Sequence, residues 1–326
     1  MRYSVPLPAC AGRSEAFPFH PEATVKKILF DSGGRLRNGW WIVVFIVLMV
    51  VSRFVYTPVS RALQDLGVPT DWLEPLRLAF LLGVTWICVH LRKERLSSVG
   101  FVLDARWARG FGTGTLLGIA SALLAVAMIW AAGGVRLELD PARSVATMAY
   151  GAYMFLFVAL FEETLFRGFM FQRLVAGAGP WVAQITSGLL FATSHWGNPD
   201  MHGATLAWAT VELFLGAVLL GLAYLRTRSL ALPIGIHLGW NWTHGHLLGF
   251  GVSGFAQAGW FHPLLQDRPE WVTGGRFGPE ASIFAVAADV LLIVVLWQWK
   301  GAAARPDAAA LGLGPLRQAG VVAIRR

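Results

Sequence analysis

Two adjacent carboxylates, Glu162 and Glu163, lie within a long apolar stretch that runs from about residue 147 to residue 175. Ionisable groups inside a membrane-spanning helix cost about 2.5–3.5 kcal/mol each on insertion scales, and they usually mark function. In a helix, Glu163 and Arg167 are one turn apart and can form an ion pair. Glu162 points about 100° away from Glu163 and has no local partner, so it is a candidate general base. The alternative is a helix end among lipid headgroups, where both charges are solvated.

A histidine follows at a matching distance beyond a turn. The segment Ala176-Gly177-Ala178-Gly179-Pro180 is typical of a tight turn between two helices. Glu162 precedes this turn by about 15 residues and His195 follows it by about 17. At about 1.5 Å per residue, an antiparallel hairpin brings the two to the same level. Phe191 lies one helical turn before His195 and shares its face. A lone histidine near a helix end can also be a capping or interfacial residue.

A third polar pair, His237 and Asn241, is spaced to share one face of a later helix. A carboxylate, two imidazoles and a carboxamide suffice for amide hydrolysis. Glu162 and His195 can hold and deprotonate water, while His237 and Asn241 can donate hydrogen bonds to an oxyanion. One alternative is a hydrogen-bonded core pair. Another is a zinc or other divalent metal site held by Glu162, His195 and His237, although the HExxH spacing is absent.

The composition indicates a polytopic membrane protein. The 326 residues are 56% hydrophobic and 14% charged, and the mean hydropathy is +0.56. The formal net charge of +8 comes from basic residues that recur between apolar stretches and in the tails. This pattern favours contact with anionic membrane lipids and gives no support for a nucleic-acid partner.

Eight apolar stretches predict an all-α fold of about eight transmembrane helices with the site inside the membrane. They are about 40–56, 76–91, 111–132, 146–175, 181–196, 204–225, 230–250 and 281–299. We expect an N-terminal tail over residues 1–38, a membrane domain over 39–300 with the motifs in about 145–245, and a C-terminal tail over 301–326. The basic loops and tails alternate with neutral or acidic loops, which predicts that both termini are cytoplasmic.

Small residues on two helices predict close packing. Gly110, Gly114 and Gly118 recur every four residues and form a small-residue ridge. Gly235 and Gly239 are also one turn apart, and they would let another backbone approach closely.

Four further polar residues lie in the apolar stretches. Glu212 and Asp289 could be site residues, but an interhelical hydrogen bond is the more common role for such groups. We expect His244 and His246 to lie outside the site.

Three motifs in order resemble the CAAX-prenyl-endopeptidase and bacteriocin-processing family of intramembrane proteases, also called the CPBP or ABI family. The first motif, EExxxR, matches Glu162, Glu163 and Arg167; FxxxH matches Phe191 and His195; HxxxN matches His237 and Asn241. The resemblance covers roughly residues 145–245, and the motifs are specific only in combination.

The resemblance implies an intramembrane endopeptidase in which Glu162 and His195 activate water and His237 and Asn241 stabilise the oxyanion. Glu163, Arg167 and Phe191 would be supporting residues. It implies a membrane-associated or lipidated protein or peptide as substrate, and the loop charges fit a bacterial inner membrane. The family has been described both as metal-dependent and as glutamate-based. A non-catalytic immunity or scaffold protein and a proton-coupled transporter remain open alternatives.

Overall fold

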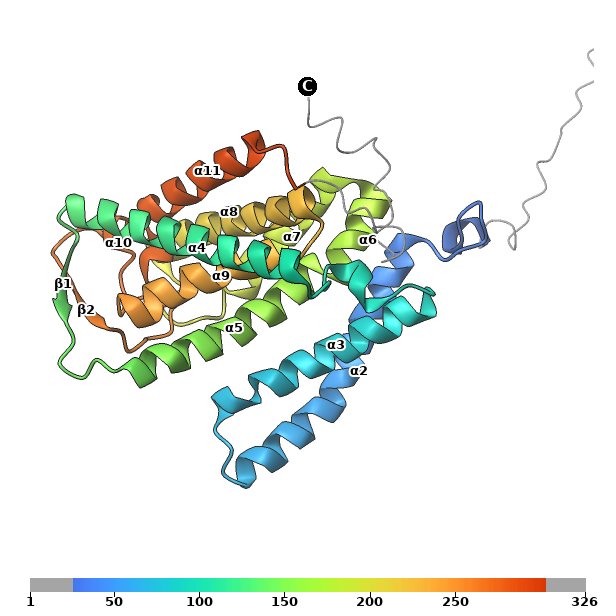
Figure 1. The fold of residues 1–326 in the computed structure, drawn as a ribbon, viewed down its shortest axis with the longest axis horizontal. Helices are drawn as coiled ribbons and strands as arrows, with labels where there is room; N and C mark the ends of the chain where they lie inside the picture. The colour runs from blue at the N-terminus through green and yellow to red at the C-terminus, as the bar shows by residue number, and fades with distance from the viewer. Residues whose placement is uncertain (1–25, 303–326) are drawn as a thin grey trace, which may run out of the picture.

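The computed structural model describes residues 26–302, which form a bundle of helices (Figure 1). Residues 1–25 and 303–326, which make up most of the two expected tails, lie outside the described residues. Each of the eight apolar stretches contains a helix, so the all-α fold class is confirmed. The main helices are α2 (Asn38–Asp65), α3 (Glu74–Leu91), α4 (Ala105–Ala131), α5 (Val145–Arg167), α6 (Phe169–Ala178), α7 (Pro180–Ser194), α8 (Gly203–Thr227), α9 (Ala231–Trp242) and α11 (Ile283–Gln298).

Within the described residues, five segments are long and apolar enough to cross a membrane. They are Asn38–Asp65, Thr70–Leu91, Ala105–Ala131, Val145–Ala178 and Gly203–Thr227. The helices α7, α9 and α11 are shorter, with 15, 12 and 16 residues. A span of the hydrocarbon core needs about 20 residues. The count of eight spans therefore stays a prediction.

The longest predicted helix is broken at Gly168, the residue after Arg167. Gly168 has φ −74° and ψ −131°, which ends α5 and starts α6. A Cβ at this position would collide with the carbonyl oxygen of Thr164. The break separates the charged end of α5 from the short helix that leads into the turn. That turn forms as predicted, because α6 ends at Ala178 and α7 begins at Pro180.

The glycines of α4 and α9 interlock. A Cβ on Gly114 or Gly118 would collide with backbone oxygens of α9, and one on Gly235 or Gly239 would collide with backbone oxygens of α4. The two helices run side by side through the bundle (Figure 1). The predicted small-residue packing is confirmed for these four positions, and it fixes the helix that carries His237 and Asn241.

The helices α2 and α3 extend away from the rest of the bundle (Figure 1). Their inner ends pack on α6 through a cluster that includes Phe45, Leu81 and Phe169. Only 6% of the most apolar 18-residue stretch of α2 is buried in the protein, so most of this helix is available to lipid.

A small sheet that the sequence did not predict closes one end of the bundle. Strands β1 (Val135–Leu139) and β2 (Phe261–Leu265) pair antiparallel, with Leu137 opposite Pro263. Between α9 and β2, the chain makes a π-helical turn, η3 (Thr243–Leu247), and then an irregular segment. After β2 come the short helix α10 (Glu270–Thr273) and the turn η4 (Pro279–Ala281), which leads into α11. The irregular segment before β2 includes residues 252–258, which face the interior of the bundle.

Candidate active site

The four polar residues expected to act in chemistry, Glu162, His195, His237 and Asn241, line one cavity of about 820 Å³. Most of its walls come from α5, α7, α8, α9 and α11 and from the 252–258 segment, and the start of α3 also contributes through Glu74 and Arg77. The helical hairpin that was expected to level Glu162 with His195 is interrupted at Gly168. Even so, both side chains reach the same space.

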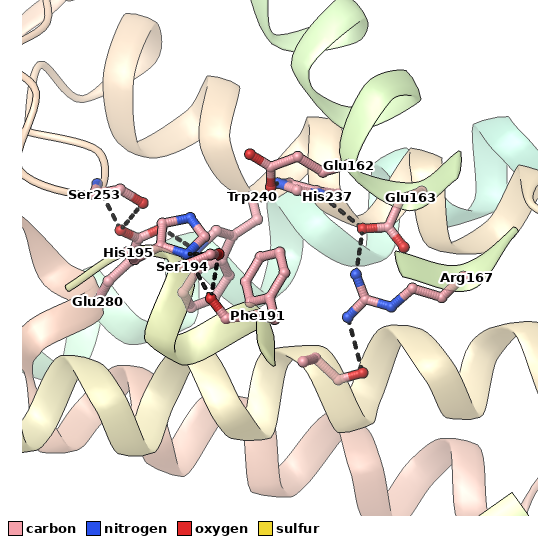
Figure 2. A network of polar contacts seen from close by, with 11 residues as sticks. Glu162, Glu163, Arg167, Phe191, Ser194, His195, His237, Trp240, Ser253 and Glu280 are labelled. Atoms are coloured by element: carbon pink, nitrogen blue, oxygen red, sulfur yellow. Dashed lines mark hydrogen bonds and ion pairs between the residues drawn. The ribbon is translucent and has the colours of Figure 1, made fainter. Parts of the chain in front are cut away.

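Behind the cavity wall, Arg167 and Glu163 form a buried ion pair (Figure 2). The Nη1 atom of Arg167 donates to Glu163 Oε1 over 2.9 Å, and both side chains are completely buried. Nη2 of Arg167 donates to the carbonyl oxygen of Ala217 on α8, also over 2.9 Å. The predicted pair is therefore confirmed, and it ties α5 to α8.

The same glutamate oxygen also binds His237. Nδ1 of His237 lies 2.9 Å from Glu163 Oε1, and since a carboxylate can only accept, Nδ1 carries the proton. The other ring nitrogen, Nε2, lies 3.7 Å from Glu162 Oε2. That distance is too long for a hydrogen bond. Glu163 therefore sets the ring orientation and leaves Nε2 beside Glu162.

The two neighbouring glutamates differ in exposure. The side chain of Glu162 is 21% exposed and lines the cavity. The side chain of Glu163 is completely buried and does not reach it. The roughly 100° between adjacent helical residues produces this division.

His195 follows the last residue of α7 as its C-cap. Its Nδ1 donates to the carbonyl oxygen of Phe191 over 2.8 Å, which leaves Nε2 without the proton when the ring is neutral. The ring of Phe191 lies between the two imidazoles, with centroid distances of 4.7 Å to His195 and 6.4 Å to His237. Phe191 also faces the guanidinium of Arg167 at 5.1 Å. One aromatic ring thus separates the two histidines and covers the buried arginine.

Asn241 lies one helical turn after His237 on α9, is buried, and lines the same cavity. Within the described residues, its carboxamide has no hydrogen-bond partner in the protein. It can therefore donate to a group that enters the cavity.

Three carboxyl groups form a second polar part of this cavity: Glu212 on α8, Glu280 in η4 and Asp289 on α11. Glu280 accepts from the backbone and the hydroxyl of Ser253, at 2.7 and 3.0 Å, and from Trp240 Nε1 at 3.3 Å. Within the described residues, Glu212 and Asp289 each keep a buried oxygen without a partner. The expected interhelical hydrogen bonds of these two residues are therefore wrong.

Sequence reasoning missed Glu280 because it lies in a connection outside every periodic segment. It also placed both later histidines outside the site. That expectation is wrong for His246, which lines the cavity through the π-helical turn. His244 is fully buried against Trp240, with a centroid distance of 4.5 Å, and does not line the cavity.

Zinc was an open alternative for Glu162, His195 and His237. Across residues 26–302, no three His, Cys, Asp or Glu side chains come together in an arrangement that could hold a metal ion. The three candidate ligands therefore do not fit a metal centre as they stand.

The geometry agrees with a comparison to known families. Residues 144–243 match the family model described as Type II CAAX prenyl endopeptidase Rce1-like. The match covers the three motif segments and the helices α5 to α9 that carry them. No curated protein and no solved structure matches the chain. Over these residues the chain resembles the CPBP family of CAAX-type intramembrane endopeptidases, which are hydrolases, and its long apolar helices are those of a multi-pass membrane protein.

Proposed function

We propose that the protein hydrolyses a peptide bond of a membrane-associated or lipidated protein or peptide, with water activated by Glu162 and His195. The observation that carries this proposal is the shared cavity. A partly exposed carboxylate, two imidazoles and a carboxamide open onto it, while a buried Arg167–Glu163 pair holds one imidazole from behind.

The water step depends on Glu162 and His195. Because Nδ1 of His195 is engaged with the Phe191 carbonyl, its Nε2 can accept a hydrogen bond from water. Glu162 takes the proton of that water, and the resulting hydroxide forms a bond to the scissile carbonyl carbon. When the C–N bond breaks, the proton held by Glu162 passes to the departing nitrogen. The products are a carboxylic acid and an amine, and water is the only co-substrate.

The oxyanion step depends on His237 and Asn241. His237 lies between two glutamates, at 2.9 Å from Glu163 and 3.7 Å from Glu162. In the doubly protonated ring, Nδ1–H is held by Glu163 and Nε2–H is a hydrogen-bond donor into the cavity. The Asn241 amide is a second donor one turn away. Two donors fixed before the substrate arrives stabilise the charge that develops on the carbonyl oxygen.

The substrate class is supported by the apolar face of α5 in the cavity. Met154, Phe155, Val158, Phe161 and Leu165 line it together with the polar groups. Such a wall suits apolar side chains or a lipid tail beside the scissile bond. We further propose that residues 39–300 form the catalytic membrane domain, and that it resides in a bacterial inner membrane with both termini cytoplasmic.

Glu162→Gln tests the proposal, because glutamine is nearly isosteric and cannot accept the proton. Membrane peptides from cells producing the native protein are compared with those from cells producing Glu162→Gln. Peptides that depend on the native protein are then cleaved in vitro by purified enzyme. We expect a 10²–10⁴-fold loss of rate in Glu162→Gln. The matched control is Glu138→Gln, which changes an exposed glutamate on β1 and should keep the native rate.

If the protein is a non-catalytic scaffold, Glu162→Gln should behave like the native protein. If folded Glu162→Gln cleaves a verified substrate at the native rate, water activation by Glu162 is wrong. The scaffold interpretation replaces ours if two results are found together. The native protein yields no cleaved peptide, and Glu162→Gln restores an immunity phenotype in cells that lack the native protein.

A further inference from the structure

A second cavity, of about 480 Å³, lies where the ends of α4, α8, α9 and α11 meet. It shares no lining residue with the catalytic cavity. Three arginines line it, Arg106 and Arg109 from the first turns of α4 and Arg228 from the end of α8. The described residues that line it include no aspartate or glutamate. Three positive charges therefore face one small space that contains no carboxylate.

Other side chains of this cavity also offer donors. The indole Nε1 of Trp107 is buried and has no hydrogen-bond partner among the described residues. Arg109 uses its Nε on the carbonyl oxygen of Ala105, at 3.3 Å, and makes no ion pair in the described part of the chain. The hydroxyl of Ser229 already accepts the backbone N–H of Ala231. A ligand that supplies acceptors and negative charge therefore suits this cavity.

Arg228 occupies a costly backbone position. It is the C-cap of α8 with φ 56° and ψ 30°, a left-handed conformation in which glycine is the unstrained choice. Its guanidinium lies over the ring of Tyr224 at 5.4 Å and makes no ion pair within residues 26–302. The fold tolerates this strain and gains a cation at the rim of the cavity.

The position of the cavity indicates a lipid as the source of the negative charge. Trp107 and Trp299 line it at helix ends, where tryptophan marks the headgroup level. The same helices carry exposed apolar side chains farther along, with Leu116 on α4 at 69% and Val295 on α11 at 49% exposure. A ligand with a phosphate at the rim and acyl chains along these faces would match both.

We propose that this cavity binds the phosphate of an anionic phospholipid, with Arg106, Arg109 and Arg228 as its cationic lining. Guanidinium groups bind phosphate oxygens with paired N–H donors. The positive end of the cavity also lies on the side that the loop charges assign to the cytoplasm, where anionic lipids are concentrated. The site is independent of peptide hydrolysis.

The test measures lipid binding to the purified full-length protein in nanodiscs. Phosphatidylglycerol is titrated into discs of phosphatidylcholine, and bound lipid is counted by native mass spectrometry. We expect preferential retention of phosphatidylglycerol and about a fivefold loss of affinity for each arginine removed. Arg109→Gln removes one charge. Arg228→Gly removes another and relieves the backbone strain, so it should remain folded. Arg61→Gln, an exposed arginine on α2, is the matched control.

The measurements test the site, the source of the negative charge and the independence of this site from peptide hydrolysis. Equal retention of phosphatidylglycerol by Arg228→Gly, Arg109→Gln and Arg61→Gln would overturn the site. Inorganic phosphate that displaces the lipid at similar concentrations would make the ligand a soluble anion and overturn the lipid assignment. Unchanged lipid binding by Glu162→Gln is expected, whether or not that variant hydrolyses peptides, so the two proposals fail separately.

Discussion

Glu163 and His237 lie 74 residues apart in the chain, yet their side chains meet at 2.9 Å in the bundle interior. The oxygen that receives His237 Nδ1 is the one that receives Arg167. Glu163 therefore holds Nδ1–H of His237 and fixes which ring nitrogen faces the cavity. A residue that never reaches the cavity thus controls one that does.

Glu163→Gln is expected to reduce turnover through His237. The amide carries no charge, so the doubly protonated His237 that donates Nε2–H to the oxyanion loses the anion that pairs with its Nδ1–H. We expect kcat to fall by about 10²-fold or more with little change in KM, since only an interaction specific to the transition state is lost. A changed KM at unchanged kcat would contradict this positioning role.

Arg167→Ala is expected to destabilise the fold as well as lower activity. It leaves the charge of Glu163 buried beside His237 without its main partner, and breaking such a pair costs about 3–5 kcal/mol. Thermal unfolding in detergent and the yield of membrane-inserted protein measure the effect. Arg61→Ala, on the exposed surface of α2, should be neutral.

The double variant Glu163→Gln with Arg167→Met separates stability from catalysis. Removing both charges avoids an unpaired buried ion, so stability should recover most of what Arg167→Ala loses. Turnover should stay low because His237 loses its anion. Native stability of Arg167→Ala with loss of turnover alone would move Arg167 into the catalytic machinery.

Asn241→Ala is expected to leave a weak residual rate. Loss of one oxyanion donor typically costs about 10²–10³-fold in kcat. His195→Ala should cost about as much as Glu162→Gln, and His237→Ala an intermediate amount. Each variant should insert and fold. Steady-state kinetics on a verified peptide gives the ranking, and an Asn241→Ala rate equal to that of the native enzyme would exclude Asn241 from oxyanion stabilisation.

Elemental analysis of the active enzyme tests whether hydrolysis depends on a bound metal ion. We expect turnover to persist in protein that carries far less than about one metal per chain after treatment with a strong chelator. One tightly bound zinc whose removal stops hydrolysis, and whose return restores it, would overturn activation of water by Glu162 and His195 alone.

Reporter fusions test the proposed orientation. Loop charges predict cytoplasmic reporters at Arg106, at Arg228 and at the C-terminus, and an external reporter near Asp267. The sheet of β1 and β2 would then lie on the outer side. An external C-terminus would contradict the eight-span topology.

Much of the helical framework could be predicted because apolar stretches and glycine spacing are local signals. The Glu163–Arg167 pair follows from spacing in one helix, and the α4–α9 contact follows from repeated glycines. The break at Gly168 could not be foreseen, since a glycine inside an apolar stretch can mark either a helix break or a close contact between helices. The β1–β2 pairing joins two short segments far apart in the chain, where no periodic pattern is long enough to show it.

The candidate site was predictable only in part, for the same reason. Spacing indicated which residues share a face, but not which faces meet. His237 was assigned to a pair with Asn241, and its contact with Glu163 emerges only when α5 and α9 pack together. Glu280 and His246 lie in irregular or π-helical backbone, where sequence spacing carries no information on direction.

The interlocked glycines of α4 and α9 have a consequence for how a substrate enters. Gly114 and Gly118 leave no clearance over which the α9 backbone could slide or rotate against α4. The wall that carries His237 and Asn241 is therefore locked against α4. The end of α5 is held as well, because Glu163 contacts His237 on α9 and Arg167 contacts Ala217 on α8. We expect the movement that admits a substrate to come from outside these contacts, with the 252–258 segment of the cavity lining as the first place to look for it.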